Sequence, residues 1–303
     1  MRRGFTLIEM IFVIVIFGIL SKFGAELLYK IYENYIYSNT LNRLQNKSEL
    51  ALKQIANRLQ YRIKDSTISR PHHLSAAYSA IGDGAEGNVT EWIGIDIDGW
   101  RGTGGSTFPE WTGFIDLDAS TPALLSTPGS NLVDNSDMAI FFIGSNVDVI
   151  DNVDHGFGWD GITIKARNTS NSDLKVVGFN VNTIATTQAG GTFTNTDVYE
   201  YYQASRSAYA VSFEADGKTV LDEYGVSHKS GSLWLYHDYK PWLGGSISAI
   251  ANNSNQKSLL VDDVVSFKFT SIGDIMVIQL CLHDDMLTAG TEGYAICKEK
   301  LVF

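Results

Sequence analysis

Cysteine and proline are both scarce in this chain. The 303 residues include only two cysteines, Cys281 and Cys297, and five prolines. Because neither cysteine belongs to a Cys-x-x-Cys or Cys/His cluster, the sequence gives no indication of a zinc site. The first proline is Pro71, so no proline interrupts a helical pattern before that residue.

Sequence motifs of two large enzyme classes are also missing. There is no Gly-x-Ser-x-Gly nucleophile turn, since Gly244-Gly245-Ser246 lacks a second glycine at the required place. No phosphate-binding Gly-x-x-x-x-Gly-Lys-Ser/Thr loop is present either. We therefore expect a protein that is not an enzyme. An exported, membrane-anchored hydrolase remains an alternative, and it would depend on an acidic loop residue such as Asp160.

Positive charge is rare in the second part of the chain. Residues 1–70 contain 11 Lys+Arg and 5 Asp+Glu, whereas residues 71–303 contain 12 Lys+Arg and 29 Asp+Glu. The second part therefore has a net charge of 12 − 29 = −17. Such a surface repels a phosphate backbone, so we expect no bulk binding of nucleic acid.

Long apolar runs are confined to the N-terminus. Arg2, Arg3 and Gly4 precede the run from Phe5 to Leu20, in which Glu9 is the single charged residue. A secretory signal peptide has its small residue after the apolar run, so the order is reversed here. An acidic side chain in a membrane-spanning helix costs about 2.5–3.5 kcal/mol on insertion scales, so such residues usually have a partner.

The segment Gly4-Phe5-Thr6-Leu7-Ile8-Glu9-Met10 resembles the prepilin signature of type IV pilins and type II secretion pseudopilins. The resemblance implies that a prepilin peptidase cleaves after Gly4 and methylates the new N-terminus, Phe5. It implies that Glu9 neutralises the N-terminal amine of a neighbouring subunit, with Thr6 beside that contact. A plain signal anchor, with Glu9 near lipid headgroups, is the alternative.

The position of Arg2 and Arg3 predicts the orientation in the membrane. By the positive-inside rule the N-terminus is cytoplasmic and everything after the span lies outside. Together with the resemblance, this orientation implies a single-pass inner-membrane protein with a periplasmic head, which later enters a pilus or pseudopilus. The expected partners are prepilin peptidase, other minor and major pilins or pseudopilins, and inner-membrane lipid.

The expected periplasmic compartment predicts whether Cys281 and Cys297 are oxidised. An even number of cysteines in an oxidising space predicts one disulfide, and two buried free thiols are the alternative. Many members of the pilin family also carry a C-terminal disulfide, so the resemblance favours the bridge.

Apolar residues continue at helical spacing beyond the anchor. The line comprises Leu41, Leu44, Ser48, Leu52, Ile55, Leu59 and Ile63. It predicts a helix from Phe5 to about Asp65, near 90 Å long at 1.5 Å per residue, with Pro71 as its limit. We divide the chain into a leader (1–4), a membrane and filament-core helix (5–25), an amphipathic continuation (26–70) and a head (71–303).

The head has the composition of a β-rich domain, with β-branched and aromatic runs separated by Gly, Ser, Thr and Asn. We expect an α+β fold in which the second half of the helix packs on an antiparallel sheet. The last three strands should form a meander. The predicted strands are Trp92–Ile97, Thr112–Leu117, Met138–Ile143, Gly161–Lys165, Leu174–Val181, Ala208–Phe213, Lys218–Asp222, Leu233–Tyr236, Val264–Phe269, Ile275–Leu282 and Tyr294–Val302.

One acidic loop suggests a calcium site. Asp148, Asp151, Asp154 and Asp160 supply oxygen ligands at short spacing, and calcium takes 6–8 such ligands. The EF-hand spacing is not met, and a solvated acidic turn is the alternative. No other cofactor is expected.

The size of the head distinguishes a minor subunit from a major subunit that repeats along the filament. A head of about 230 residues has a radius of gyration near 17 Å, far more than the 8–10 Å between packed helices. Such heads would crowd one another if every subunit carried one. We expect a minor pilin or pseudopilin that initiates or caps a filament. A pilus-tip adhesin, or a minor pilin that binds DNA or a surface, is the alternative.

Overall fold

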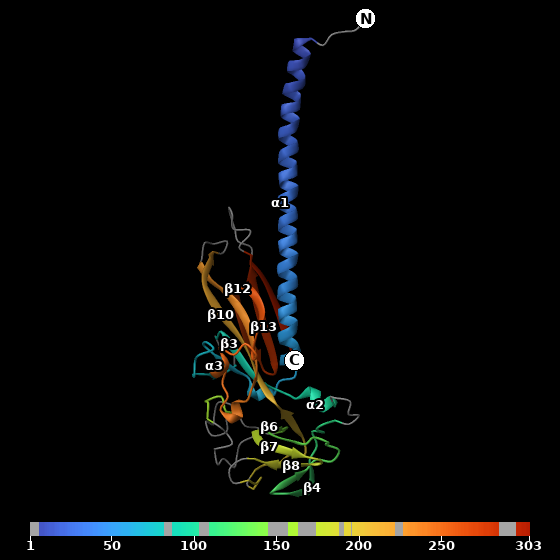
Figure 1. Cartoon of the computed structure of the whole chain (residues 1–303), viewed down its shortest axis with the longest axis vertical. Coiled ribbons are helices and arrows are strands. Elements are labelled where there is room, and N and C mark those ends of the chain that lie inside the picture. Colours follow the sequence, from blue (N-terminus) through green and yellow to red (C-terminus); the bar gives the residue numbers. More distant parts are fainter. Residues whose placement is uncertain are drawn as a thin grey trace.

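The computed structural model describes residues 6–81, 87–102, 109–144, 157–162, 174–187, 191–194, 196–221, 227–284 and 295–303. The chain folds as one long helix, α1 (Leu7–Leu59), and a β-rich head beside and beyond its second half (Figure 1). The predicted α+β architecture, with a long N-terminal helix and antiparallel sheets, is confirmed.

The first sheet has eight strands in the order β14-β13-β12-β11-β10-β3-β1-β2. Each neighbouring pair is antiparallel. The strands are β1 (Ile68–Arg70), β2 (Ser79–Ala80), β3 (Val89–Gly94), β10 (Ser207–Leu221), β11 (Ser227–Tyr239), β12 (Lys257–Ile272), β13 (Ile275–His283) and β14 (Ala295–Val302).

The second sheet has six strands in the order β4-β5-β8-β7-β6-β9. They are β4 (Asp116–Thr121), β5 (Leu124–Ser126), β6 (Asp134–Phe142), β7 (Leu174–Asn180), β8 (Thr183–Thr186) and β9 (Tyr202–Ser205). The residues just before β4 pair with those just before β9: Phe114 forms a bridge with Tyr201, and Tyr202 N–H donates to the Gly113 carbonyl. The two edges of the sheet thus meet, and we call β4–β9 the distal barrel.

Short helical turns connect these strands: η1 (Lys64–Ser66), α2 (Ile97–Arg101), η3 (Pro241–Leu243) and α3 (Ile247–Ile250).

The second half of α1 packs on the first sheet along the predicted stripe. Its buried residues are Thr40, Leu44, Ser48, Ala51, Leu52, Ile55, Ala56 and Leu59. The apolar members of this set share a core with Trp92 of β3, Phe267 and Phe269 of β12 and Leu280 of β13. At roughly 1.5–3 kcal/mol for each large side chain, burial of this stripe dominates the contact between helix and head.

The helix ends earlier than the expected position near Asp65. After Leu59 the chain turns, and Ile63 N–H donates to the Ile93 carbonyl while Ile95 N–H donates to the Tyr61 carbonyl. These bonds to β3 and the residue following it replace helical ones. Residues 68–70, which we expected to be helical, therefore form β1.

The predicted C-terminal meander is confirmed. β12, β13 and β14 pair in sequence, and Cys281 faces Cys297 across β13 and β14. These two cysteines form the predicted disulfide. The expected strand 208–213 and residues 218–221 of the next expected strand both belong to the single long strand β10, and residue 222 lies outside the described residues. The short strands β1, β2, β5, β8 and β9 were not predicted, and residues 163–165 of another expected strand lie outside the described residues.

The distal barrel is inserted between two strands of the first sheet. Gly94 at the end of β3 and Ser207 at the start of β10 are register partners, so the chain leaves and re-enters the sheet at one place. In β6, Met138, Ile140 and Phe142 face the barrel core. Phe141, between them, packs with Ile93 of the first sheet in a second, shared core.

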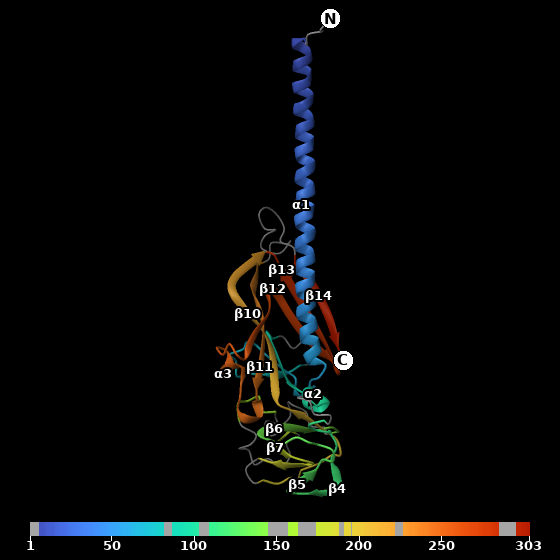
Figure 2. The ribbon, with the colours of Figure 1, turned by 45° about the vertical axis from the view of Figure 1, so that its right-hand side comes forward.

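The barrel lies at the end of the molecule farthest from the N-terminus. In Figures 1 and 2 it lies on the line that continues the axis of α1 past Leu59.

We expect Leu52→Ala to lower the free energy of unfolding by about 2–5 kcal/mol, because it opens a cavity between α1 and the sheet. Leu50, on the same helix, is 60% exposed, whereas Leu52 is 3% exposed. Leu50→Ala should change stability by no more than about 0.5 kcal/mol. Denaturant unfolding of the full chain in detergent, followed by circular dichroism, measures both. Equal effects would contradict the packing described.

Candidate functional site

The start of α1 holds the first candidate site. Thr6 is the N-cap, and Glu9 in the first turn accepts hydrogen bonds from Thr6 N–H and from the Thr6 hydroxyl, each at 2.9 Å. Both bonds end on Glu9 Oε2, so Oε1 accepts no hydrogen bond from any described residue. Gly4 and Phe5, the predicted cleavage and methylation residues, lie outside the described residues.

The capping bond gives Glu9 a local role as well as the expected one between subunits. A carboxylate at a helix N-terminus is stabilised by the free N–H groups and the helix dipole. Glu9 is therefore partly satisfied within its own chain, and Oε1 stays available for a cation from another subunit.

The helix that follows leaves its apolar side chains uncovered. From Leu7 to Tyr35 every residue of α1 is exposed, and this part of α1 is long and apolar enough to cross a membrane. An exposed apolar surface of this extent needs lipid or other helices around it.

Ion pairs connect α1, and the turn that follows it, to the head. Lys47 Nζ lies 2.6 Å from Asp262 Oδ1, and the hydrogen bond from Lys47 lowers the pKa of Asp262 below its ordinary value. Arg43 pairs with Asp284. Beyond the end of α1, Lys64 Nζ of η1 lies 2.8 Å from Asp274 Oδ2.

Arg206, between β9 and β10, joins the distal barrel to the first sheet. Its guanidinium contacts three carboxylates: Nε lies 2.9 Å from Asp96, Nη1 2.6 Å from Asp134 and Nη2 2.8 Å from Glu110. Burial raises the pKa of Asp134, but hydrogen bonds from Ser136 and the charge of Arg206 outweigh it, so this pKa lies below its usual value. The single cation holds together side chains from three separate segments.

A buried ion pair lies beside the shared core. Arg70 Nε lies 2.7 Å from Glu91 Oε1, and both side chains are almost fully buried. Arg70 also donates to the carbonyls of Trp159 and Ala76, and the Tyr239 hydroxyl donates to Glu91 Oε2. Because these groups are hydrogen-bonded, the buried charges are compensated.

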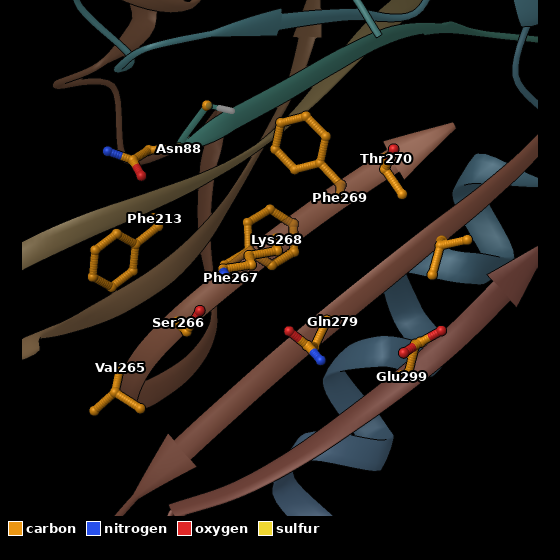
Figure 3. Close-up of a pocket in the computed structure, with 12 residues that line it drawn as sticks. Asn88, Phe213, Val265, Ser266, Phe267, Lys268, Phe269, Thr270, Gln279 and Glu299 are labelled. Carbon is orange, nitrogen blue, oxygen red and sulfur yellow. The ribbon is translucent and has the colours of Figure 1, made fainter. Parts of the chain in front are cut away.

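A cavity of about 530 Å³ lies beside the C-terminal half of β12. Figure 3 shows Asn88 and Phe213 on one side of it, and β12 with Phe267 and Phe269 on the other. Gln279 and Glu299 come from the next two strands. Among the described residues no group of His, Cys, Asp or Glu side chains could hold a metal ion.

The predicted calcium ligands are not brought together by the described structure. Asp148, Asp151 and Asp154 lie outside the described residues. Asp160 follows buried Trp159, and its Oδ1 accepts the Ile162 N–H at 3.0 Å, as in an ordinary acidic turn. The calcium site stays a prediction.

Sequence reasoning singled out Thr6 and Glu9 but missed Arg206 and the Arg70–Glu91 pair. The partners of Arg206 lie 72–110 positions away in the sequence, so no local spacing indicates them. An isolated arginine between two strands of an acidic head was the one available signal.

Comparison with known proteins bears on the first candidate site. Residues 1–21 match the family model described as the prokaryotic N-terminal methylation motif, which is the signature of type IV pilins and pseudopilins. Neither curated proteins nor solved structures gave a match to this chain. The chain thus carries the signature that the resemblance of Gly4 to Met10 predicts, and its apolar helix fits a single-pass inner-membrane protein.

We expect Arg206→Met to lower the free energy of unfolding by about 2 kcal/mol, because charged hydrogen bonds are lost and three carboxylates are left close together. Paired Asp134 stabilises the fold above its unfolded pKa of 3.8. That contribution disappears as the pH falls below this value, because the carboxylate becomes protonated. The difference in the free energy of unfolding between the variant and the unchanged protein should therefore become smaller at acidic pH. Arg101→Met, at an exposed arginine of α2, is the matched control. A deficit independent of pH would contradict the ionic role.

Proposed function

We propose that this protein is a minor pilin or pseudopilin that initiates or caps a filament, and that its role is structural, not enzymatic. The methylation motif supports processing by a prepilin peptidase and assembly with other pilins. The finer assignment to a single place in the filament rests on the shape of the head.

The position of the distal barrel carries this proposal. It lies across the continuation of the α1 axis, at the end opposite the N-terminus. Filament subunits that pack their N-terminal helices side by side repeat along one axis. A barrel that lies on the continuation of the α1 axis obstructs any subunit placed farther from the membrane. The present protein therefore fits the end of the filament farthest from the membrane.

The barrel is also fixed in that position. Phe141 and Val176 lie on the outer surface of the barrel. They share a core with Ile63, which follows α1, and with Ile93 of β3. Arg206 adds the three ionic contacts at the junction. Packed cores deform little, so the barrel cannot swing aside to admit another subunit.

The orientation follows from the charges at the N-terminus. Arg2 and Arg3 favour a cytoplasmic N-terminus and a periplasmic head. The disulfide between Cys281 and Cys297 fits that oxidising compartment. In this arrangement the barrel points away from the inner membrane.

A tip-located binding module is the second candidate, and one observation favours it. The rings of Phe114 and Tyr201 lie edge to face at 6.1 Å on the outside of the barrel. Their exposed fractions are 39% and 56%. Exposed aromatic side chains are frequent at binding hot spots.

We expect Glu9→Gln and Glu9→Ala to insert and to be cleaved normally, but both should fail to enter filaments. The glutamine variant can still accept the Thr6 N–H but carries no charge, whereas the alanine variant loses both. Comparison of the two variants therefore separates the capping role of Glu9 from its charge. Neutralisation of a sister amine requires the carboxylate, because a buried unpaired ammonium is strongly unfavourable. Sheared filaments probed for the protein, with mass spectrometry of the mature N-terminus as control, test this. Normal incorporation of Glu9→Gln would refute the pairing.

We also expect about one copy of the protein per filament. Filaments separated by length and quantified by mass spectrometry should show a ratio of this protein to the major subunit that falls as length increases. A constant ratio would mean that the subunit repeats along the filament, and it would contradict the capping role.

A further inference from the structure

The two halves of α1 carry their apolar and polar residues on opposite sides of the helix. Beside the head, the line Thr40, Leu44, Ser48, Ala51 and Ile55 is buried. The opposite side of this half is polar, with Asn42, Asn46 and Lys53 exposed.

Above the head the pattern is reversed. Every charged residue between positions 21 and 39 falls on one line at steps of three or four: Lys22, Glu26, Lys30 and Glu33. The opposite side of the same segment carries Gly24, Leu28, Ile31 and Tyr35, which are uncharged and exposed. We call the first line the charged stripe.

The charged stripe is in line with the buried one. From Glu33 a step of four leads to half-buried Tyr37, and a step of three leads to Thr40, the first buried residue. Residues three or four apart lie on one face of a helix. The charged stripe thus lies on the side of α1 that bears the head.

We propose that the charged stripe is the docking surface for the head of the next pilin-like subunit toward the membrane. The inference rests on the proposed function. The uncharged side, with Leu28, Ile31 and Tyr35, packs against sister helices in the filament core. The side that bears the head faces outward, where the head of a neighbouring subunit can cover it.

The charges fit this occupant. In the half of α1 that packs on the head, the protein's own head pairs helix charges with side chains of the opposite sign. Asp262 pairs with Lys47 and Asp284 with Arg43. Lys298 of the head pairs with Glu49 of the helix. Lys22, Glu26 and Lys30 form no ion pair with the described residues. Their alternating signs suit a head surface that bears both charges, since opposed potentials set the register of an interface.

Site-specific photo-crosslinking in assembled filaments tests this inference. A benzoylphenylalanine in place of Lys30 probes the charged stripe of the full chain, and one in place of Ile31 probes the opposite side. We expect position 30 to crosslink to head peptides of another pilin-like subunit, and position 31 to N-terminal helix peptides. Mass spectrometry of the crosslinked peptides identifies both.

Each other outcome contradicts the inference in a distinguishable way. Helix peptides or lipid alone at position 30, with helix peptides at position 31, would overturn the docking surface but leave the filament role intact. No crosslink to any pilin-like subunit from either position would overturn the proposed function as well. Glu26, replaced in the same way, should repeat the result of position 30.

Discussion

Burial of one stripe of α1 against the eight-stranded sheet is the contact on which the rest of the molecule depends. Leu44, Leu52, Ile55 and Leu59 join a core with β3, β12, β13 and β14. The sheet covers only the half of the helix that begins at Thr40. The other half therefore keeps its apolar surface, and the methylation motif lies at the start of that half. One helix thus meets two surroundings, a folded head and an apolar medium.

The head is built as a sheet with a barrel inserted into it, and the join is both apolar and ionic. Residues 138–142 of β6 are buried on both faces, toward the barrel core and toward the shared core. Arg206 contacts three carboxylates there, and Arg70, which pairs with Glu91 within the first sheet, donates to the Trp159 carbonyl of the inserted segment. A satisfied buried ion pair contributes little net stability but penalises other arrangements, because separation would leave a charge buried without a partner. These contacts keep the barrel in line with α1.

Regular, local patterns could be predicted from the sequence. The leucine stripe has helical spacing, the last three strands alternate, and Cys281 and Cys297 are the two cysteines present. The end of α1 could not be predicted, because it depends on the bond from Ile63 to Ile93. Closure of the distal barrel depends on Phe114 and Tyr201, which lie far apart in sequence. Strands as short as β5 and β8 have too few residues to show a period.

The sequence by itself determined the anchor, the motif at its start and the charged and apolar stripes that follow one another along one side of α1, because each depends only on side-chain types at fixed helical spacing. The tertiary structure alone decided where the barrel lies and which carboxylates surround Arg206. These features arise from contacts between distant segments, and their positions follow from packing in three dimensions rather than from any local period.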